Sequence, residues 1–143
     1  MAMISVEDFQ ALIEEHLPLV GLFGIRTEEI GKGTARLRMH FNPSLMRPGG
    51  TVAGPALMAL ADVTLYAVAL GLIGKVELAV TTNLNINFLR KPGPADVVCE
   101  GRILKLGKRL AVAECSLHSV DEDDLVAHVT GTYSIPPVIP TGQ

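Results

Sequence analysis

The chain has 143 residues, 48% hydrophobic and 19% charged, which predicts a single domain over residues 1–143 with a substantial core. Its net charge of -3 and aromatic content of 4% argue against a nucleic-acid-binding protein, which needs a basic surface with aromatic side chains. The spacing of Cys99 and Cys115 indicates neither a zinc site nor a disulfide framework, and the first residues lack a basic signal segment. We therefore expect a soluble cytoplasmic protein that binds no metal, nucleic acid or membrane.

A short helix and a half-buried strand are the first predicted elements. Ser5, followed three positions later by Asp8, is typical of a helix N-cap with an acid in the first turn, and apolar residues then recur at helical spacing as far as Pro18. We expect this helix over residues 5–17. Residues 33–41 alternate between apolar and polar side chains, which indicates a strand, and a loop rich in turn-forming residues follows over residues 42–50.

The next predicted element is an apolar helix over residues 55–70 whose only charged residue is Asp62. At ~1.5 Å per residue it would be roughly 24 Å long, too short to cross a ~30 Å bilayer without strain. It is therefore expected to be a core helix, and because it is apolar on every face, other elements must wrap it. An unpaired carboxylate in such surroundings costs several kcal/mol, so Asp62 requires a purpose.

Four strands are expected after the helix, over residues 78–88, 96–106, 110–120 and 125–135, before a proline-containing tail over residues 136–143. In the first of them, alternation assigns Val80, Thr82 and Leu84 to the apolar face, and Thr81 and Asn83 to an amide-rich face. The order of elements predicts an α+β fold in which one curved, antiparallel sheet of about five or six strands wraps a long apolar helix. Two such sheets can join edge to edge, which favours a dimer.

Residues 54–62, Gly-Pro-Ala-Leu-Met-Ala-Leu-Ala-Asp, resemble the helix start of hotdog-fold acyl-CoA thioesterases, in particular of the phenylacetate-degradation (PaaI-like) branch. Residues 79–90, 107–112 and 126–133 resemble later parts of the same family in the same order. The resemblance implies a hotdog fold, hydrolysis of an acyl-CoA thioester, a homodimer that can pair into a dimer of dimers, and no cofactor, because coenzyme A is part of the substrate.

The same resemblance implies three catalytic positions. Asp62 would act on the thioester as nucleophile or as base for a water, the backbone N–H of Gly54 would polarise its carbonyl, and Thr81 matches a polar residue that holds water or carboxylate. Gly54 suits this role because the N–H groups at a helix N-terminus are unpaired and the helix dipole favours an oxyanion there. The sequence departs from the family at Ala53-Gly54-Pro55, where many members have His-Gly-Gly.

Candidate substrate-binding residues are Arg47, Asn42, Met58, Tyr66, Arg90, Lys91, Lys108 and Arg109. The last four either meet the phosphates of coenzyme A or are solvated strand ends. Met58 and Tyr66 either line the acyl pocket or pack in the core. An Asn that some family members place before the helix falls on Arg47, with Asn42 nearby, and the role is assigned to neither. The four histidines, His16, His40, His118 and His128, are expected to be surface residues, because none has a nearby acidic partner at ligand spacing in the sequence.

Gly54 and Asp62 are separated by ~12 Å along one helix, so they cannot bind the same carbonyl from one chain. We therefore expect Asp62 of one subunit to face Gly54 of another across two antiparallel helices. Two alternatives remain: a non-catalytic acyl-CoA-binding or sensing protein of the same fold, and a hydroxyacyl-thioester dehydratase. The dehydratase would need a histidine near the helix entry, and none lies between His40 and His118.

Overall fold

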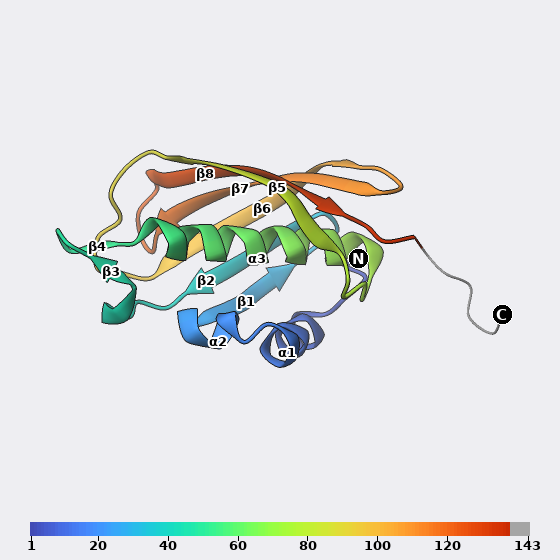
Figure 1. The fold of residues 1–143 in the computed structure, drawn as a ribbon, viewed down its shortest axis with the longest axis horizontal. Helices are drawn as coiled ribbons and strands as arrows, with labels where there is room; N and C mark the ends of the chain where they lie inside the picture. Colours follow the sequence, from blue (N-terminus) through green and yellow to red (C-terminus); the bar gives the residue numbers. More distant parts are fainter. Residues whose placement is uncertain (138–143) are drawn as a thin grey trace.

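One long helix, α3 (Gly54–Ile73), lies along the inner face of a curved sheet in the computed structural model, which describes residues 1–137 (Figure 1). The six strands run in the order β1-β2-β6-β7-β8-β5, with every neighbouring pair antiparallel. They are β1 (Ile25–Ile30), β2 (Thr34–Met39), β5 (Val80–Phe88), β6 (Val97–Leu106), β7 (Leu110–Ser119) and β8 (Leu125–Ser134). The predicted α+β hotdog fold is confirmed, and its five predicted strands correspond to β2 and β5 to β8.

The N-terminal part contains one predicted helix and two elements that were not predicted. Helix α1 (Val6–His16) is capped by Ser5, whose side chain accepts a hydrogen bond from the Asp8 N–H, as expected. Helix α2 (Leu19–Phe23) is too short to show helical periodicity. Strand β1 shows no alternation, because Ile25 is its only buried residue. In Figure 1 both helices lie beside β1.

The segment between β2 and α3 is mainly the predicted loop, but it also contains a short 3-10 helix, η1 (Pro43–Leu45), and a small hairpin of β3 (Met46–Arg47) and β4 (Thr51–Val52). Figure 1 shows the hairpin at the N-terminal end of α3. At the other end of the chain, only Pro136 and Pro137 of the predicted tail lie within the described residues.

Helix α3 is four residues longer than predicted, and its 20 residues span about 30 Å. The predicted length argument against a membrane span is therefore wrong, since the helix is long and apolar enough to cross a bilayer. Packing supports a core helix instead, because 67% of its apolar window is buried inside the fold. The wrapping is incomplete, however. A stripe that recurs at helical spacing is exposed or half-buried, and consists of Pro55, Met58, Ala59, Asp62 and Tyr66.

Strand β5 contains a bulge that changes which side chains face the helix. Its pairing with β8 shifts between Thr81 and Asn83, so Thr82 is an extra residue. Thr81 consequently lies on the same side as Leu84, facing α3, while Val80 and Thr82 are exposed. The predicted assignment of Val80 and Thr82 to the buried face is therefore wrong, because strict alternation holds only for an unbulged strand.

The two edges of the sheet differ. At the β1 edge, Gln10 of α1 accepts a hydrogen bond from the Thr27 N–H (2.8 Å) and donates one to the Ile25 carbonyl (3.3 Å). At the β5 edge, no further strand pairs within residues 1–137, and the side chains of Val80 and Phe88 are 57% and 54% exposed. Because unpaired strand edges readily join another strand, β5 is the edge available for association.

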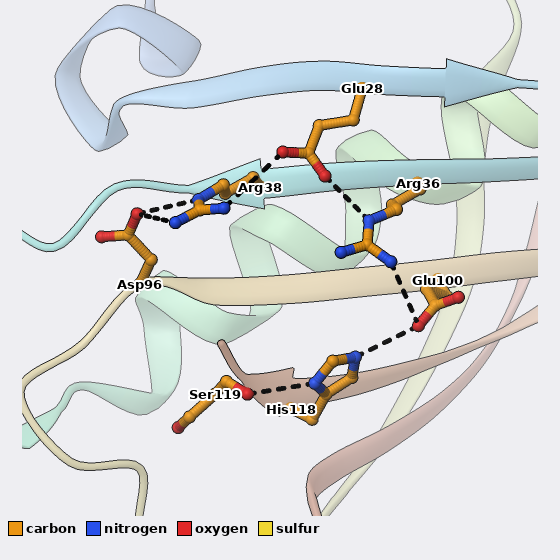
Figure 2. Close-up of polar contacts among 7 residues, drawn as sticks. All are labelled: Glu28, Arg36, Arg38, Asp96, Glu100, His118 and Ser119. Carbon is orange, nitrogen blue, oxygen red and sulfur yellow. Dashed lines mark hydrogen bonds and ion pairs between the residues drawn. The ribbon is translucent and has the colours of Figure 1, made fainter. Parts of the chain in front are cut away.

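The outer face of the sheet carries a network of charged side chains (Figure 2). Arg36 lies between Glu28 and Glu100, and Arg38 bonds Asp96. Each histidine has an acidic neighbour, which the sequence analysis did not predict; the pairs are His16–Glu15, His40–Asp96, His118–Glu100 and His128–Glu114. Three of these pairs join residues that the fold brings together from different segments. Of the four histidines expected at the surface, His118 and His128 are partly buried, with 19% and 33% of the side chain exposed.

Candidate active site

Asp62 lies on the uncovered stripe of α3, and two hydroxyl groups hold one of its carboxylate oxygens. Thr81 Oγ1 donates a hydrogen bond to Asp62 Oδ1 over 2.5 Å, and the Tyr133 phenol donates to the same oxygen over 2.9 Å. The phenol also lies 2.9 Å from the backbone carbonyl oxygen of Asp62. No hydrogen bond from residues 1–137 reaches Oδ2, so this oxygen is left for another partner.

The two hydroxyls converge because Thr81 and Tyr133 are direct partners across β5 and β8. Cross-strand neighbours on one face lie about 5 Å apart, close enough for both to reach one carboxylate oxygen. The sequence analysis proposed Thr81 but missed Tyr133, which is only 5% exposed. The available signal was a tyrosine in the last apolar strand, since a buried phenol normally has a hydrogen-bond partner. Burial, and then the charge of Asp62, raise the pKa of the Tyr133 phenol, which keeps it a donor.

Two cavities meet at Asp62 and Thr81. An apolar cavity of about 400 Å³ lies between α2 and α3 and includes Leu19, Phe23 and Met58. A second cavity, of about 230 Å³, is bounded by residues of α1 and includes Tyr66 and Tyr133. Met58 thus shares a cavity wall with Asp62. Tyr66 lies on the other side, where its hydroxyl donates to the Glu77 carbonyl oxygen over 2.9 Å.

Gly54 is the first residue of α3, and it lies in a third cavity. Within residues 1–137 its N–H has no acceptor, and the preceding N-cap residue, Ala53, makes no side-chain cap. A Cβ at Gly54 would lie 3.2 Å from the Phe88 ring, so the ring at the end of β5 packs directly over this backbone. The arrangement leaves an unpaired donor at the positive end of the helix dipole.

The cavity at Gly54 is about 410 Å³ and also contains Arg47, Arg90 and Lys91. Arg47 comes from the small hairpin, and the other two follow β5. Arg90 pairs with Asp124 at 2.8 Å, which offsets part of its charge. The cavity therefore combines a helix N-terminus with a net cationic wall, a combination suited to anionic groups.

Three of the predicted substrate-binding residues lie outside these cavities. The Asn42 side chain caps η1 and accepts hydrogen bonds from the N–H and hydroxyl of Ser44. Lys108 and Arg109 are exposed in the turn between β6 and β7. This turn lies at the end of the sheet where β5 starts, because the Arg109 carbonyl accepts a hydrogen bond from the Ile135 N–H, and the preceding Ser134 pairs with Val80. Since β5 is about 30 Å long, they cannot meet Arg90 and Lys91 at one phosphate within a single chain.

Comparison with known proteins gives consistent matches over most of the chain. Residues 49–126 match the family model of the thioesterase superfamily. A Saccharolobus solfataricus protein named a "putative esterase" is 34% identical, over 93% of this chain and 87% of its own length. The crystal structure of a "putative thioesterase" from Silicibacter sp. TM1040 is 40% identical with a TM-score of 0.86, over 96% of this chain and 95% of that one. A mutant of the phenylacetic acid degradation protein PaaI from Thermus thermophilus shares the fold, with 24% identity, a TM-score of 0.74, and coverage of 83% and 99%.

Proposed function

Because the chain belongs to the thioesterase superfamily, as its sequence predicted, we propose that it hydrolyses an acyl-CoA thioester to a carboxylic acid and coenzyme A. The observation that carries this proposal is the Asp62 carboxylate, which Thr81 and Tyr133 hold by one oxygen at the edge of an apolar cavity. The names of the relatives, esterase and thioesterase, support the same class of reaction. Water is the second substrate, and the reaction needs no metal or redox cofactor.

The complete site would lie between two subunits, as Asp62 and Gly54 lie in different cavities of one chain. Strand β5 relates them: Asp62 bonds Thr81 near its start, and Gly54 packs beside Phe88 at its end. If the free β5 edges of two copies pair antiparallel, the start of one strand lies beside the end of the other. This pairing would bring Asp62 toward Gly54 of the partner subunit, and it supports a homodimer.

In this site the carbonyl oxygen of the thioester accepts a hydrogen bond from the Gly54 N–H, which stabilises the negative charge that develops there. If Asp62 acts as a base, it takes a proton from a water whose oxygen attacks the carbonyl carbon; the carbon–sulfur bond breaks and the thiolate takes up a proton. If Asp62 is the nucleophile, its oxygen attacks the carbonyl carbon, the carbon–sulfur bond breaks, and the thiolate leaves and takes up a proton; water then hydrolyses the resulting anhydride to the acid and free Asp62. Both routes end at the same products.

The remaining contacts follow from the chemistry of the two cavities. The apolar cavity beside Met58 suits the acyl group, because its other walls include Leu19 and Phe23. The cationic cavity at Gly54 suits the phosphates of coenzyme A, through Arg47 and Lys91, with Arg90 shared with Asp124. These two cavities would adjoin in the dimer.

A thiol-release assay on a panel of aromatic and aliphatic acyl-CoAs tests the reaction. We expect Asp62→Asn to lower kcat by at least about 10²-fold, because the amide can neither accept a proton nor attack the carbonyl. Equal rates for the two proteins would contradict the mechanism. If wild type releases no thiol but acyl-CoA raises its melting temperature, the protein is a binding or sensing protein instead.

A mixing experiment tests the shared site. Gly54→Pro removes the N–H at a helix position that tolerates proline, and Gly54→Ala is its matched control, because it adds a Cβ near Phe88 but keeps the donor. In a mixed dimer of Asp62→Asn and Gly54→Pro subunits, one site carries both changes and the other is intact. Random mixing should restore about one quarter of wild-type activity. No recovery would refute a shared site.

A further inference from the structure

We propose that Tyr133 is a positioning residue for Asp62: with Thr81 it fixes Oδ1 and thereby presents Oδ2 to the thioester. The inference rests on the proposed function and identifies the oxygen that acts. Tyr133 is 5% exposed, bonds Asp62 through Oδ1, and does not line the apolar cavity beside Met58 that we propose for the acyl group.

The hydrogen bonds at Asp62 all reach one side of the carboxylate. Oδ1 accepts from Thr81 and Tyr133, and the phenol also lies within hydrogen-bond distance of the Asp62 carbonyl oxygen. The phenol has one proton to donate and lies within reach of both of these Asp62 oxygens, and its bond to Oδ1 restrains rotation of the carboxylate. Such restraint matters because a reacting group must stay near its productive orientation for the chemical step to be fast.

Tyr133 is itself held by an aromatic column that joins three elements. Its ring stacks on Tyr66 of α3, with centroids 5.7 Å apart and an interplanar angle of 17°, and Tyr66 packs edge-on against Phe9 of α1 at 5.6 Å. Burial and the negative charge of Asp62 both raise the pKa of the Tyr133 phenol, so it stays protonated and continues to donate. The column thus keeps the phenol at a constant place relative to Asp62.

Tyr66 provides a matched control. It belongs to the same stack, but its hydroxyl donates to the Glu77 carbonyl oxygen and not to the carboxylate. Replacing either tyrosine with phenylalanine keeps the ring and removes one hydroxyl, so the two variants test packing equally. Only Tyr133→Phe removes a donor to Asp62.

The first measurement compares kcat and KM for these variants in the thiol-release assay. We expect Tyr133→Phe to lower kcat on the order of 10-fold with KM changed by less than about twofold, and Tyr66→Phe, which keeps the donor to Asp62, to lower kcat clearly less. If the two phenols were only structural, both variants would have lower melting temperatures, and Tyr133→Phe would show no selective loss of kcat. An unchanged kcat for Tyr133→Phe, or an equal loss in both variants, would overturn the proposal.

The second measurement does not depend on activity. The chain has two tyrosines and no tryptophan, so in Tyr66→Phe the ultraviolet absorbance of phenolate reports Tyr133 alone. We expect the pKa of the Tyr133 phenol to lie above the ordinary value of about 10. Adding Asp62→Asn should lower this pKa, because the negative charge beside the phenol is then gone. No change on adding Asp62→Asn would refute the contact. If the shift occurs but wild type hydrolyses no acyl-CoA, the proposal fails through the function on which it rests.

Discussion

Thr81 Oγ1 donates a 2.5 Å hydrogen bond to Oδ1 of Asp62, and a bulge at the next residue, Thr82, places the Thr81 side chain on the face of β5 toward the helix. We expect Thr81→Val, which keeps the shape but removes the hydroxyl, to lower kcat on the order of 10-fold, and Thr81→Ser to retain most activity. Thr82→Val is the control, because the exposed Thr82 hydroxyl bonds only the Thr132 carbonyl, at 3.3 Å. Equal kcat for Thr81→Val and wild type would show that the hydroxyl is dispensable.

The free edge of β5 predicts that charge at its centre will separate the subunits. Asn83 and Asn85 are exposed there, so the isosteric double change Asn83→Asp and Asn85→Asp should leave the monomer folded. In a two-fold pairing four carboxylates would gather near the axis, which favours the monomer at low ionic strength, while salt restores the dimer. Sedimentation velocity measures the change, and activity should fall with the dimer fraction. An active monomer would argue against a site shared by two chains.

Close contact between α3 and the sheet predicts a cost for adding one methyl group at Gly131. A Cβ there would lie 2.5 Å from Leu65 Cδ1 and 3.2 Å from the Asn83 carbonyl oxygen. We expect Gly131→Ala to lower the free energy of unfolding by about 1–3 kcal/mol in denaturant titrations. Gly93→Ala, where no atom lies within 4 Å, should change it by less than about 0.5 kcal/mol. Equal stability of the two variants would mean that the helix moves away at no cost.

The outer-face network predicts an acid-sensitive contribution from Asp96 (Figure 2). Burial alone would raise the pKa of Asp96, but the Phe41 N–H and the side chains of Arg38 and His40 lower it below its usual value. The unfolded chain therefore binds protons more readily than the folded chain. The contribution of Asp96 to the free energy of unfolding is complete above the unfolded pKa of about 3.9, and it is lost as pH falls through the folded pKa. Asp96→Asn should lower the free energy of unfolding by about 1–3 kcal/mol at neutral pH, and the stability of this variant should fall less than that of wild type on acidification.

The control for Asp96→Asn is Asp123→Asn, at an exposed position in the loop between β7 and β8. Its unfolding free energy should match wild type within about 0.5 kcal/mol at every pH. Chemical denaturation between neutral pH and about pH 3 measures all three proteins. If Asp96→Asn and wild type lost stability in parallel on acidification, the contacts of Asp96 would not contribute as inferred.

Elements with a long repeating pattern were predictable from the sequence, and those without one were not. Helix α3 is an almost wholly apolar run of 20 residues, and strands β5 to β8 each have a pattern that extends over nine or more residues. Strand β1 has one buried residue, and α2 has five residues, so neither develops a period. The bulge at Thr82 was also unpredictable, since it arises from the register between β5 and β8.

The sequence by itself determined that Asp62 is the residue to explain, because a single acid in an apolar helix is costly wherever the helix packs. It also predicted Gly54 and Thr81, which lie at the helix start and in the strand after the helix. Tyr133 is 71 residues from Asp62 in sequence, and only the tertiary structure brought its phenol to the carboxylate. Local patterns report which faces of an element are apolar, whereas a hydrogen bond between distant segments depends on strand register and packing, which no local pattern encodes.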